Sequence, residues 1–284
     1  MTEAQPAAPT AGVAMTAIGV AVIRARESAR PDRLYDDPLA RHFADAARRS
    51  FATMPEGEQR WARLEALADI FFEGRSVGVR LVDDRMVEAV TAGCRQIVIL
   101  GAGLDTRAFR LTLPADVRFF EIDLPELFAF KEPVLAATVP RYDRTIIASD
   151  LRENWSELLR ANGFRADVPT CWVDEGSLGY LSRDDALRVA ETLTELSARG
   201  SQFGAGRFHV DRNLPHYAEL GRLVGGEHSD EGRDLSGLGP GAEGWLTAHG
   251  WRTSFRRWDD LVAPLNRPAA VRDADVGLIL AVRE

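Results

Sequence analysis

A continuous apolar run that stops at a glycine turn constrains the fold of this chain more than any other feature. Residues 96–100 form the run, and Gly101-Ala102-Gly103 follows it directly. Apolar runs without polar alternation are typical of strands covered on both faces, as in parallel sheets. Glycine lets the backbone turn sharply and approach a ligand at the carboxyl end of the strand. The feature therefore predicts a parallel sheet with a binding crevice at that end.

Further apolar runs follow, and helical stretches such as 184–198 separate most of them. This alternation predicts an α/β fold, with a mostly parallel sheet and helices on both faces. The last two runs are close enough in sequence to form an antiparallel hairpin at the sheet edge. The strands expected after the first are 117–122, 145–148, 170–174, 207–210, 251–256 and 276–282.

The 284 residues are enough for one large domain, or one domain with a cap. Residues 1–10 are predicted to be a disordered tail. Residues 11–90, rich in alanine, arginine and leucine, form a helical cap in this interpretation. Residues 91–284 form the sheet domain, and 201–243 is expected to be a loop or flap inserted in it.

Charge and composition limit the classes of partner that the chain is expected to bind. The chain has 43 acidic residues against 35 Lys and Arg, a net charge of -8, which disfavours a phosphate backbone. It has no apolar run of the roughly 20 residues that cross a bilayer, and no secretory signal. Cys94 and Cys171 belong to no metal-ligand pattern, and we expect both to be buried hydrophobic residues. We therefore expect a cytoplasmic protein without a nucleic-acid, membrane or metal partner.

Carboxylates after the second strand indicate what the glycine turn binds. Glu121 and Asp123 lie about 20 residues beyond the turn, the spacing at which a carboxylate accepts hydrogen bonds from a ribose diol. NAD is one interpretation, but its fingerprint has a third glycine where this chain has Thr106. Asp105, at a helix amino end, would also oppose a phosphate. S-adenosylmethionine carries no phosphate and is the favoured cofactor.

Two later strand ends add to this crevice. Asp150 and Leu151 follow the third strand, where the carboxylate suits the adenine amino group and the leucine suits the ring. An aspartate at that place is also a common helix cap. Glu175 follows the fourth strand and lies at the mouth of a crevice in such a sheet.

Together these residues resemble the leucine carboxyl methyltransferase-like family of class I S-adenosylmethionine-dependent methyltransferases. Within it they are most similar to a bacterial branch that includes polyketide O-methyltransferases. The resemblance extends from about Thr16 to Val282. The motifs that carry it are Thr16-Ala17, Arg24-Ala25-Arg26-Glu27-Ser28, Tyr35-Asp36-Asp37-Pro38-Leu39-Ala40, residues 96–110, Phe120-Glu121-Ile122-Asp123-Leu124-Pro125, Asp150-Leu151, Glu175-Gly176, Tyr180-Leu181, Gly244-Trp245-Leu246 and His249-Gly250-Trp251.

The resemblance implies a Rossmann-like fold, with a seven-stranded, mostly parallel sheet, an antiparallel edge strand and an amino-terminal cap over the acceptor pocket. It also implies an arginine ahead of the first strand that holds the cofactor carboxylate. We assign Arg80 to this role, although Gly78 stands near the expected place and Arg75 is also nearby. The cofactor residues it implies are Gly101, Ala102, Gly103, Asp123, Asp150, Leu151 and Glu175, with Glu121 as the alternative ribose ligand.

Methyl transfer from a sulfonium depends mainly on alignment of the acceptor with the methyl group. An alcohol or phenol acceptor would gain from a general base, for which His209, His216 and Tyr180 are the candidates. A small-molecule O-methyltransferase of secondary metabolism is favoured. A protein carboxyl methyltransferase, and a binding protein or non-methylating enzyme on the same fold, stay open. A homodimer also stays open.

Overall fold

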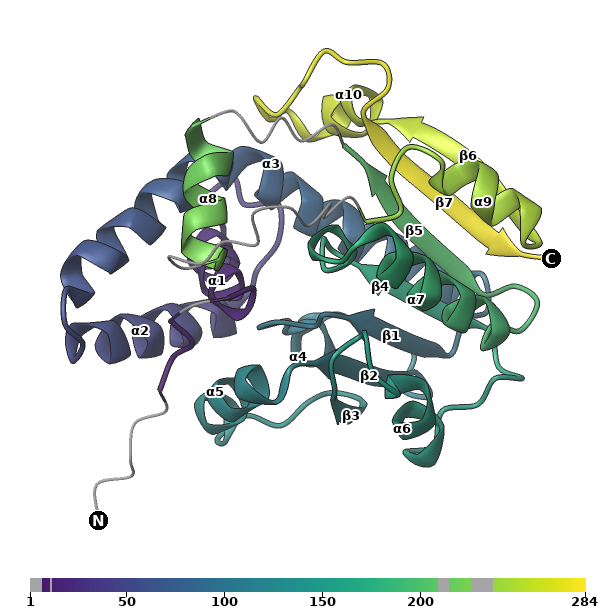
Figure 1. Ribbon diagram of the computed structural model, residues 1–284, viewed down its shortest axis with the longest axis horizontal. Coiled ribbons are helices and arrows are strands. Elements are labelled where there is room, and N and C mark those ends of the chain that lie inside the picture. Colours follow the sequence, from purple (N-terminus) through teal and green to yellow (C-terminus); the bar gives the residue numbers. More distant parts are fainter. Residues whose placement is uncertain (1–6, 11, 209–214, 226–236) are drawn as a thin grey trace.

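Seven strands form one sheet in the computed structural model, which describes residues 7–10, 12–208, 215–225 and 237–284. The strand order is β3-β2-β1-β4-β5-β7-β6. Strands β1 to β5 are parallel to one another, and β7 is antiparallel to both β5 and β6 (Figure 1). The strands are β1 (Gln96–Leu100), β2 (Arg118–Asp123), β3 (Asp143–Ala148), β4 (Thr170–Asp174), β5 (Gln202–Arg207), β6 (Trp251–Arg257) and β7 (Gly277–Arg283).

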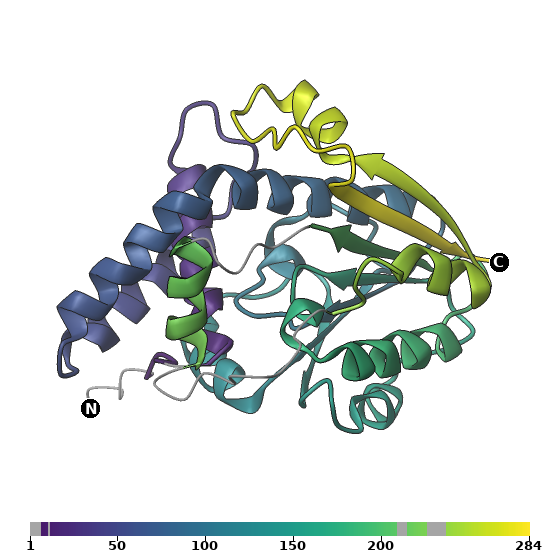
Figure 2. The same cartoon turned by 45° about the horizontal axis from the view of Figure 1, so that its top comes forward.

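Helices cover both faces of this sheet (Figure 2). The predicted α/β architecture, with an antiparallel pair at one edge, is confirmed; β7, the antiparallel strand, lies one place in from that edge. The helices are α1 (Ala14–Ser28), α2 (Pro38–Ala52), α3 (Gly57–Thr91), α4 (Arg107–Arg110), α5 (Pro125–Leu135), α6 (Trp155–Ala161), η1 (Leu178–Tyr180), α7 (Arg183–Glu195), α8 (Pro215–Gly225), α9 (Ala242–Ala248), α10 (Trp258–Val262) and η3 (Ala263–Leu265).

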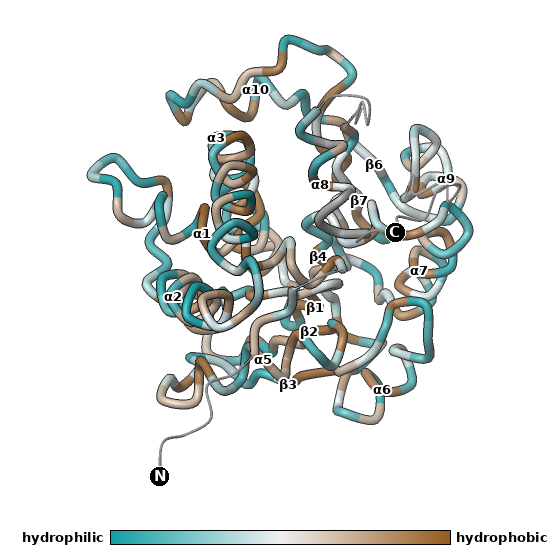
Figure 3. Tube along the Cα trace, turned by 60° about the vertical axis from the view of Figure 1, so that its left-hand side comes forward, coloured by the Kyte–Doolittle hydropathy of each residue, from teal (hydrophilic) through white to brown (hydrophobic). Residues whose placement is uncertain are grey.

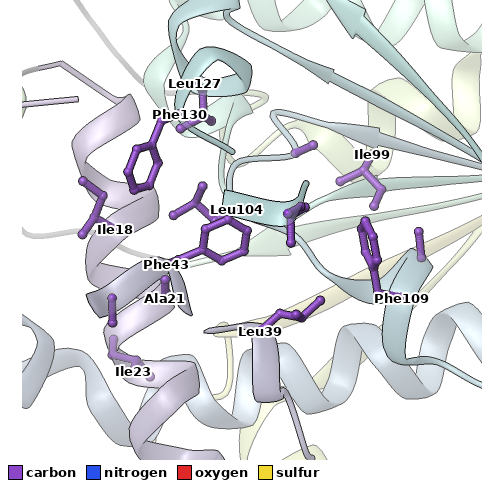
Figure 4. Packing of buried hydrophobic residues seen from close by; sticks show 14 of the residues in the cluster. Ile18, Ala21, Ile23, Leu39, Phe43, Ile99, Leu104, Phe109, Leu127 and Phe130 are labelled. Carbon is purple, nitrogen blue, oxygen red and sulfur yellow. The ribbon is translucent and has the colours of Figure 1, made fainter. Parts of the chain in front are cut away.

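The two faces of the sheet have separate hydrophobic cores because successive strand residues point to opposite sides. Ile97 and Ile99 of β1 face a core shared with α1 to α5, while Val98 and Leu100 face α6, α7 and α9. Figure 4 shows part of the first core, where side chains of α1, α2 and α5 gather around Leu104. Each fully buried aliphatic or aromatic side chain contributes about 1.5–3 kcal/mol. Burial on both faces explains the unbroken apolar run in β1.

The first three helices pack together beside the sheet (Figures 1 and 2). A proline at its first position and the Asp37 side chain, which accepts a hydrogen bond from the Ala40 N–H, start α2. Hydrophilic and hydrophobic segments alternate along α3 (Figure 3), which spans 35 residues. Within the described ranges, no helix combines the length and the apolarity that crossing a bilayer requires.

The region 201–243 contains more regular structure than we predicted. The expected strand at 207–210 is wrong, because β5 instead occupies 202–207 and pairs with β4 and β7. Its apolar pattern is hidden by Gly204, where a Cβ would lie 1.3 Å from the Arg85 guanidinium of α3. Helix α8 also lies within the predicted flap, while residues 209–214 and 226–236 are outside the described part.

The amino-terminal tail differs from the prediction in one respect. Residues 1–6 and 11 lie outside the described residues, but residues 7–10 contact the cap. The Ala8 side chain is buried, and its N–H donates to the Ser50 hydroxyl at 2.9 Å. The predicted disordered segment therefore does not extend through residue 10.

Candidate functional site

The glycine turn after β1 has the backbone shape that only glycine adopts readily. Gly101 and Gly103 have φ angles of 63° and 52°, in the left-handed region. A Cβ on Gly101 would lie 2.3 Å from the Ser177 Cβ, and one on Gly103 would lie 3.3 Å from the Ala17 Cβ. The turn is therefore enclosed by the segment after β4 on one side and by α1 on the other.

Asp123, at the end of β2, holds the turn in place. One carboxylate oxygen accepts from the Gly103 N–H at 2.6 Å, and the other accepts from the Leu124 N–H at 2.7 Å. Burial raises the pKa of the Asp123 carboxyl, while these two amides and Lys131 oppose the rise. A carboxylate has about four acceptor sites, so each oxygen keeps capacity for a ligand hydroxyl.

Glu121 lies on the same face of β2 but deeper in the molecule. Its side chain is fully buried and paired with Lys131 at 2.6 Å and Arg144 at 2.7 Å. A buried charge has to be paired in this way because transfer from water is costly. The structure therefore does not bring Glu121 to the turn, which corrects its assignment as an alternative ribose ligand.

The cap is tied directly to the glycine turn by a buried ion pair. Arg24 of α1 donates to Asp37 at 2.8 Å and to the Leu104 carbonyl at 2.6 Å. The Thr106 hydroxyl donates to the same Asp37 oxygen at 2.7 Å. Thr106 stands where a dinucleotide fingerprint has its third glycine, and here its side chain joins the turn to the cap. The sequence motifs that contain Arg24 and Asp37 supported the family resemblance, but they did not predict this contact.

Arg107 gathers three carboxylates beside the turn. Its guanidinium pairs with Asp83 at 2.6 Å, with Glu175 at 2.8 Å and also with Asp105. Burial alone would raise the pKa of Asp105, but Arg107 and more distant cations outweigh it and lower the pKa to about 2. Arg110 pairs with Asp83 at 2.6 Å. Arg107 thus fixes Glu175 against the first strand end, a role the sequence did not signal.

Three polar atoms near Glu175 are buried without a hydrogen-bond partner among the described residues. They are the Glu175 Oε1, the Tyr35 hydroxyl and the Ser76 hydroxyl. Burial raises the pKa of the Tyr35 hydroxyl well above its usual range, while the Ser76 hydroxyl opposes the rise. These two hydroxyls therefore lie close enough to interact with each other, and the Glu175 Oε1 is the atom left without any such neighbour. Unpaired buried groups cost about 1–3 kcal/mol each, so such a cluster is expected where a polar ligand supplies the partners.

Asp150 and Leu151 lie beyond β3, next to the end of β2. The Ser149 N–H donates to the Asp123 carbonyl at 2.9 Å, which aligns the two strand ends. Asp150 is engaged by Arg152, whose hydrogen bonds lower the pKa of the carboxyl. Leu151 is partly buried against the second core. Both residues thus lie at the same sheet edge as Asp123, and their role in an adenine subsite stays a prediction.

The other predicted site residues are Arg80, Tyr180 and His209. Arg80 is engaged elsewhere, because its guanidinium pairs with Asp84 at 2.9 Å and donates to the Leu34 carbonyl at 3.0 Å. This corrects its assignment to the strand ends. Tyr180 lies in η1, three residues beyond Ser177, and is half-buried. His209 lies outside the described residues, so its role as a base stays a prediction. Among the described residues, no group of acidic, cysteine and histidine side chains forms a metal site.

Comparison with known proteins places this site in context. Residues 17–194 match the family model described as leucine carboxyl methyltransferase. A protein of Parafrankia sp. (strain EAN1pec) is 42% identical over 91% of this chain and 83% of its own length. One of Frankia alni is 40% identical over 96% and 95%. Both bear the name S-adenosyl-L-methionine-dependent methyltransferase.

Solved structures show the same fold. A structure from Thermobifida fusca YX, described as a methyltransferase, has a TM-score of 0.55 and 20% identity; the match covers 97% of this chain and 96% of that one. A DUF574 family protein from Streptomyces avermitilis also has a TM-score of 0.55, with 16% identity over 95% and 97% of the two chains.

Proposed function

The chain belongs to the leucine carboxyl methyltransferase family, and we propose that it transfers the methyl group of S-adenosylmethionine to an oxygen of a small-molecule acceptor. The family establishes the methyltransferase class, and the class I fold agrees with it. The observation that supports the proposal is a set of groups at the strand ends: the glycine turn is hydrogen-bonded to Asp123 after β2, and the Glu175 Oε1 after β4 is buried without a partner among the described residues. We place the reaction in the biosynthesis of a polyketide or another secondary metabolite.

The residues at the strand ends suit S-adenosylmethionine, and they lack the features of a pyrophosphate-binding site. Gly101, Ala102 and Gly103 allow close approach of a ligand to the backbone. Asp123 has acceptor capacity for the ribose hydroxyls, and Asp150 with Leu151 suits the adenine. Asp105 and Glu175 are both paired with Arg107, but together with Asp83 they outnumber Arg107 and Arg110 by one charge. This net negative charge opposes a phosphate and favours the positively charged methyl donor.

When bound, the donor supplies an activated methyl group whose sulfur leaves as a neutral thioether. The protein therefore has to align the acceptor and exclude water, and alignment alone is worth up to about 7–11 kcal/mol. Helices α1 and α3 close the side of the turn, through Ala17 and through the Asp83 partner of Arg107. In the proposal these cap helices cover the acceptor, and Tyr180 orients it or accepts its proton.

Direct packing of the cap on the glycine turn favours a small acceptor over a protein terminus. Arg24 and Asp37 hold the cap directly on the turn, in a pair whose side chains are 6% and 0% exposed. The family name keeps a protein carboxyl terminus as the second candidate acceptor. A carboxylate acceptor is already ionised at neutral pH and needs no base, whereas a phenol or alcohol does.

The experiment supplies a tritium-labelled methyl donor with phenolic polyketides, carboxylic polyketides or a peptide ending in leucine. We expect transfer to a polyketide, and alkali then separates labile esters from stable ethers. Tyr180→Phe should lower kcat on a phenol acceptor, with Arg63→Met as the control because Arg63 is exposed on α3. Label transfer to the peptide alone would refute the small-molecule proposal. Donor binding without transfer to any acceptor would instead favour a non-methylating protein on this fold.

A further inference from the structure

Residues 258–276, between β6 and β7, form a strap that contains α10 and η3 and packs on the cap. The strap lies alongside α3 (Figures 1 and 3), where Trp258 and Val262 share a small hydrophobic core with Val77. Leu34 packs against the same core from the cap loop, residues 29–37, which joins α1 to α2. The strap therefore contacts both the longest helix of the cap and the loop between its first two helices.

Arg267 of the strap forms a buried ion pair with the cap. Its guanidinium donates to the Glu27 carboxylate at 2.8 Å, to the Asp32 carboxylate at 2.7 Å and to the Asp32 carbonyl at 2.6 Å. The Arg267 side chain is 4% exposed, and that of Glu27 is fully buried. These partners are 240 and 235 positions away in the sequence. The pair therefore fastens the carboxyl-terminal part of the chain to the end of α1 and to the cap loop.

The backbone of the strap fixes the direction of Arg267. Asn266 has a φ of 52°, in the left-handed region that asparagine tolerates better than most residues. Pro268 disfavours helical backbone at Arg267, the residue before it. The Asp259 carboxylate accepts from two backbone N–H groups further along the strap, at 2.9 Å and 3.0 Å. The guanidinium is thus presented to the cap by a braced loop.

The cap loop connects this contact to the glycine turn. One oxygen of Glu27 accepts from Arg267 and also from the Leu34 N–H, at 2.7 Å, so it holds the middle of the loop. The loop ends at Asp37, which accepts from the Thr106 hydroxyl beside the turn at 2.7 Å. A change at Arg267 therefore reaches the turn through the cap loop.

The ion pair is buried but its hydrogen bonds are incomplete. The Glu27 Oε2 and the Arg267 Nε have no hydrogen-bond partner among the described residues. Arg30 lies 3.7 Å from the Glu27 Oε2, which is too far for a hydrogen bond. Unpaired buried polar groups raise the free energy of the state that contains them, and both atoms would gain water partners if the contact opened. The pair thus holds the cap without locking it.

We propose that Arg267 is a positioning residue that keeps the cap on the glycine turn, and that release of its contact with Glu27 and Asp32 lets ligands enter and leave the donor site. The inference rests on the proposed use of S-adenosylmethionine at that site. Because α1 encloses one side of the turn through Ala17, movement of α1 changes access from that side. A buried ion pair gives a defined geometry at little net stability, since the loss of hydration offsets much of its attraction.

The test measures how fast a bound ligand leaves. Stopped-flow displacement gives the dissociation rate of S-adenosylhomocysteine from wild type, Arg267→Met and Arg267→Lys. We expect Arg267→Met to raise this rate about threefold to thirtyfold, the range for substitutions that alter the coupling between distant sites. Arg267→Lys should lose less, because it keeps the charge and a donor. Arg256→Met replaces an exposed arginine of β6 and serves as the matched control, with an unchanged rate.

Hydrogen exchange reports on the cap itself. Amides of residues 29–37, among them the Leu34 N–H that Glu27 holds, should exchange faster in Arg267→Met than in the control. Asp32→Ala removes the other partner, whose side chain is 60% exposed, so this variant keeps the test decisive if Arg267→Met does not fold. It should raise the dissociation rate by a smaller factor than Arg267→Met.

Several results would overturn the inference. An unchanged dissociation rate in Arg267→Met and Asp32→Ala refutes it alone, provided that wild type binds S-adenosylhomocysteine. A lower urea midpoint with an unchanged rate would mean that Arg267 only stabilises the fold. Equally fast dissociation in Arg256→Met would mean that the loss of any positive charge suffices. If wild type does not bind S-adenosylhomocysteine, the proposed use of the methyl donor fails and the inference fails with it.

Discussion

Replacing Gly101 with alanine tests how the segment after β4 packs on the glycine turn. The φ of 63° costs a side chain roughly 1–2 kcal/mol in the left-handed region. The new Cβ would also lie 2.3 Å from the Ser177 Cβ, where ordinary contacts begin at 3.4 Å. Such overpacking typically costs another 1–3 kcal/mol, so the expected total is about 2–5 kcal/mol. Gly103→Ala should show mainly the backbone part, because the Ala17 Cβ at 3.3 Å has to shift only slightly to accommodate the new Cβ.

Urea unfolding of Gly101→Ala, Ser177→Gly and the double variant separates the two contributions. Ser177→Gly removes the overlapping Cβ, so the cycle should give a coupling energy of about 1–3 kcal/mol. The left-handed strain should persist in the double variant. Additive effects of the two substitutions would refute the claim that the segment after β4 packs directly on the glycine turn.

Three further measurements probe the surrounding structure. Asp37→Ala removes a fully buried ion-pair partner and should destabilise the fold by about 3–5 kcal/mol, whereas the exposed Asp36→Ala should change stability by less than about 0.5 kcal/mol. Chemical denaturation decides this, and equal effects would contradict the role of the pair. The pKa of Asp105 is lowered from 3.8 to about 2 in the fold, so its contribution of about 2 kcal/mol is present above pH 3.8 and lost as the pH falls through 2. The acid branch of the stability curve should therefore flatten in Asp105→Asn, and an unchanged slope would contradict this. Burial raises the pKa of Cys94 to about 12, and Cys171 is equally buried. A thiol reagent should modify both only after unfolding, so rapid labelling of the native protein would count against the core as described.

The sheet was predictable from sequence wherever both faces of a strand are buried. The runs at β1 and β4 have apolar side chains on each face, and their predicted bounds match the structure. Strand β5 was misplaced because Gly204 and Gly206 interrupt its apolar pattern. Gly204 is needed where Arg85 crosses the strand, a contact between residues far apart in the chain.

The site was predictable from sequence where it depends on a local pattern, but not where it depends on contacts between distant residues. The spacing from the glycine turn to Asp123 is a local pattern, and the structure joins the two by a hydrogen bond. The same spacing could not distinguish Asp123 from Glu121 as the ribose ligand. Only the folded structure shows that Glu121 is buried in an ion pair with Lys131. Likewise, Arg75 and Arg80 of α3 look equivalent in sequence. They differ only in their partners in the fold, which are the Glu175 carbonyl for Arg75 and Asp84 with the Leu34 carbonyl for Arg80.

The central claim is that the methyl donor binds at the carboxyl ends of β1, β2 and β4, with Asp123 as a direct ligand. Calorimetric titration of wild type and Asp123→Ala with S-adenosylmethionine tests it most directly. We predict one site per chain in wild type, and a loss of about 1–3 kcal/mol in the variant, the cost of removing a charged hydrogen-bond acceptor. Absence of binding in wild type, or equal affinity in the two proteins, would contradict the account.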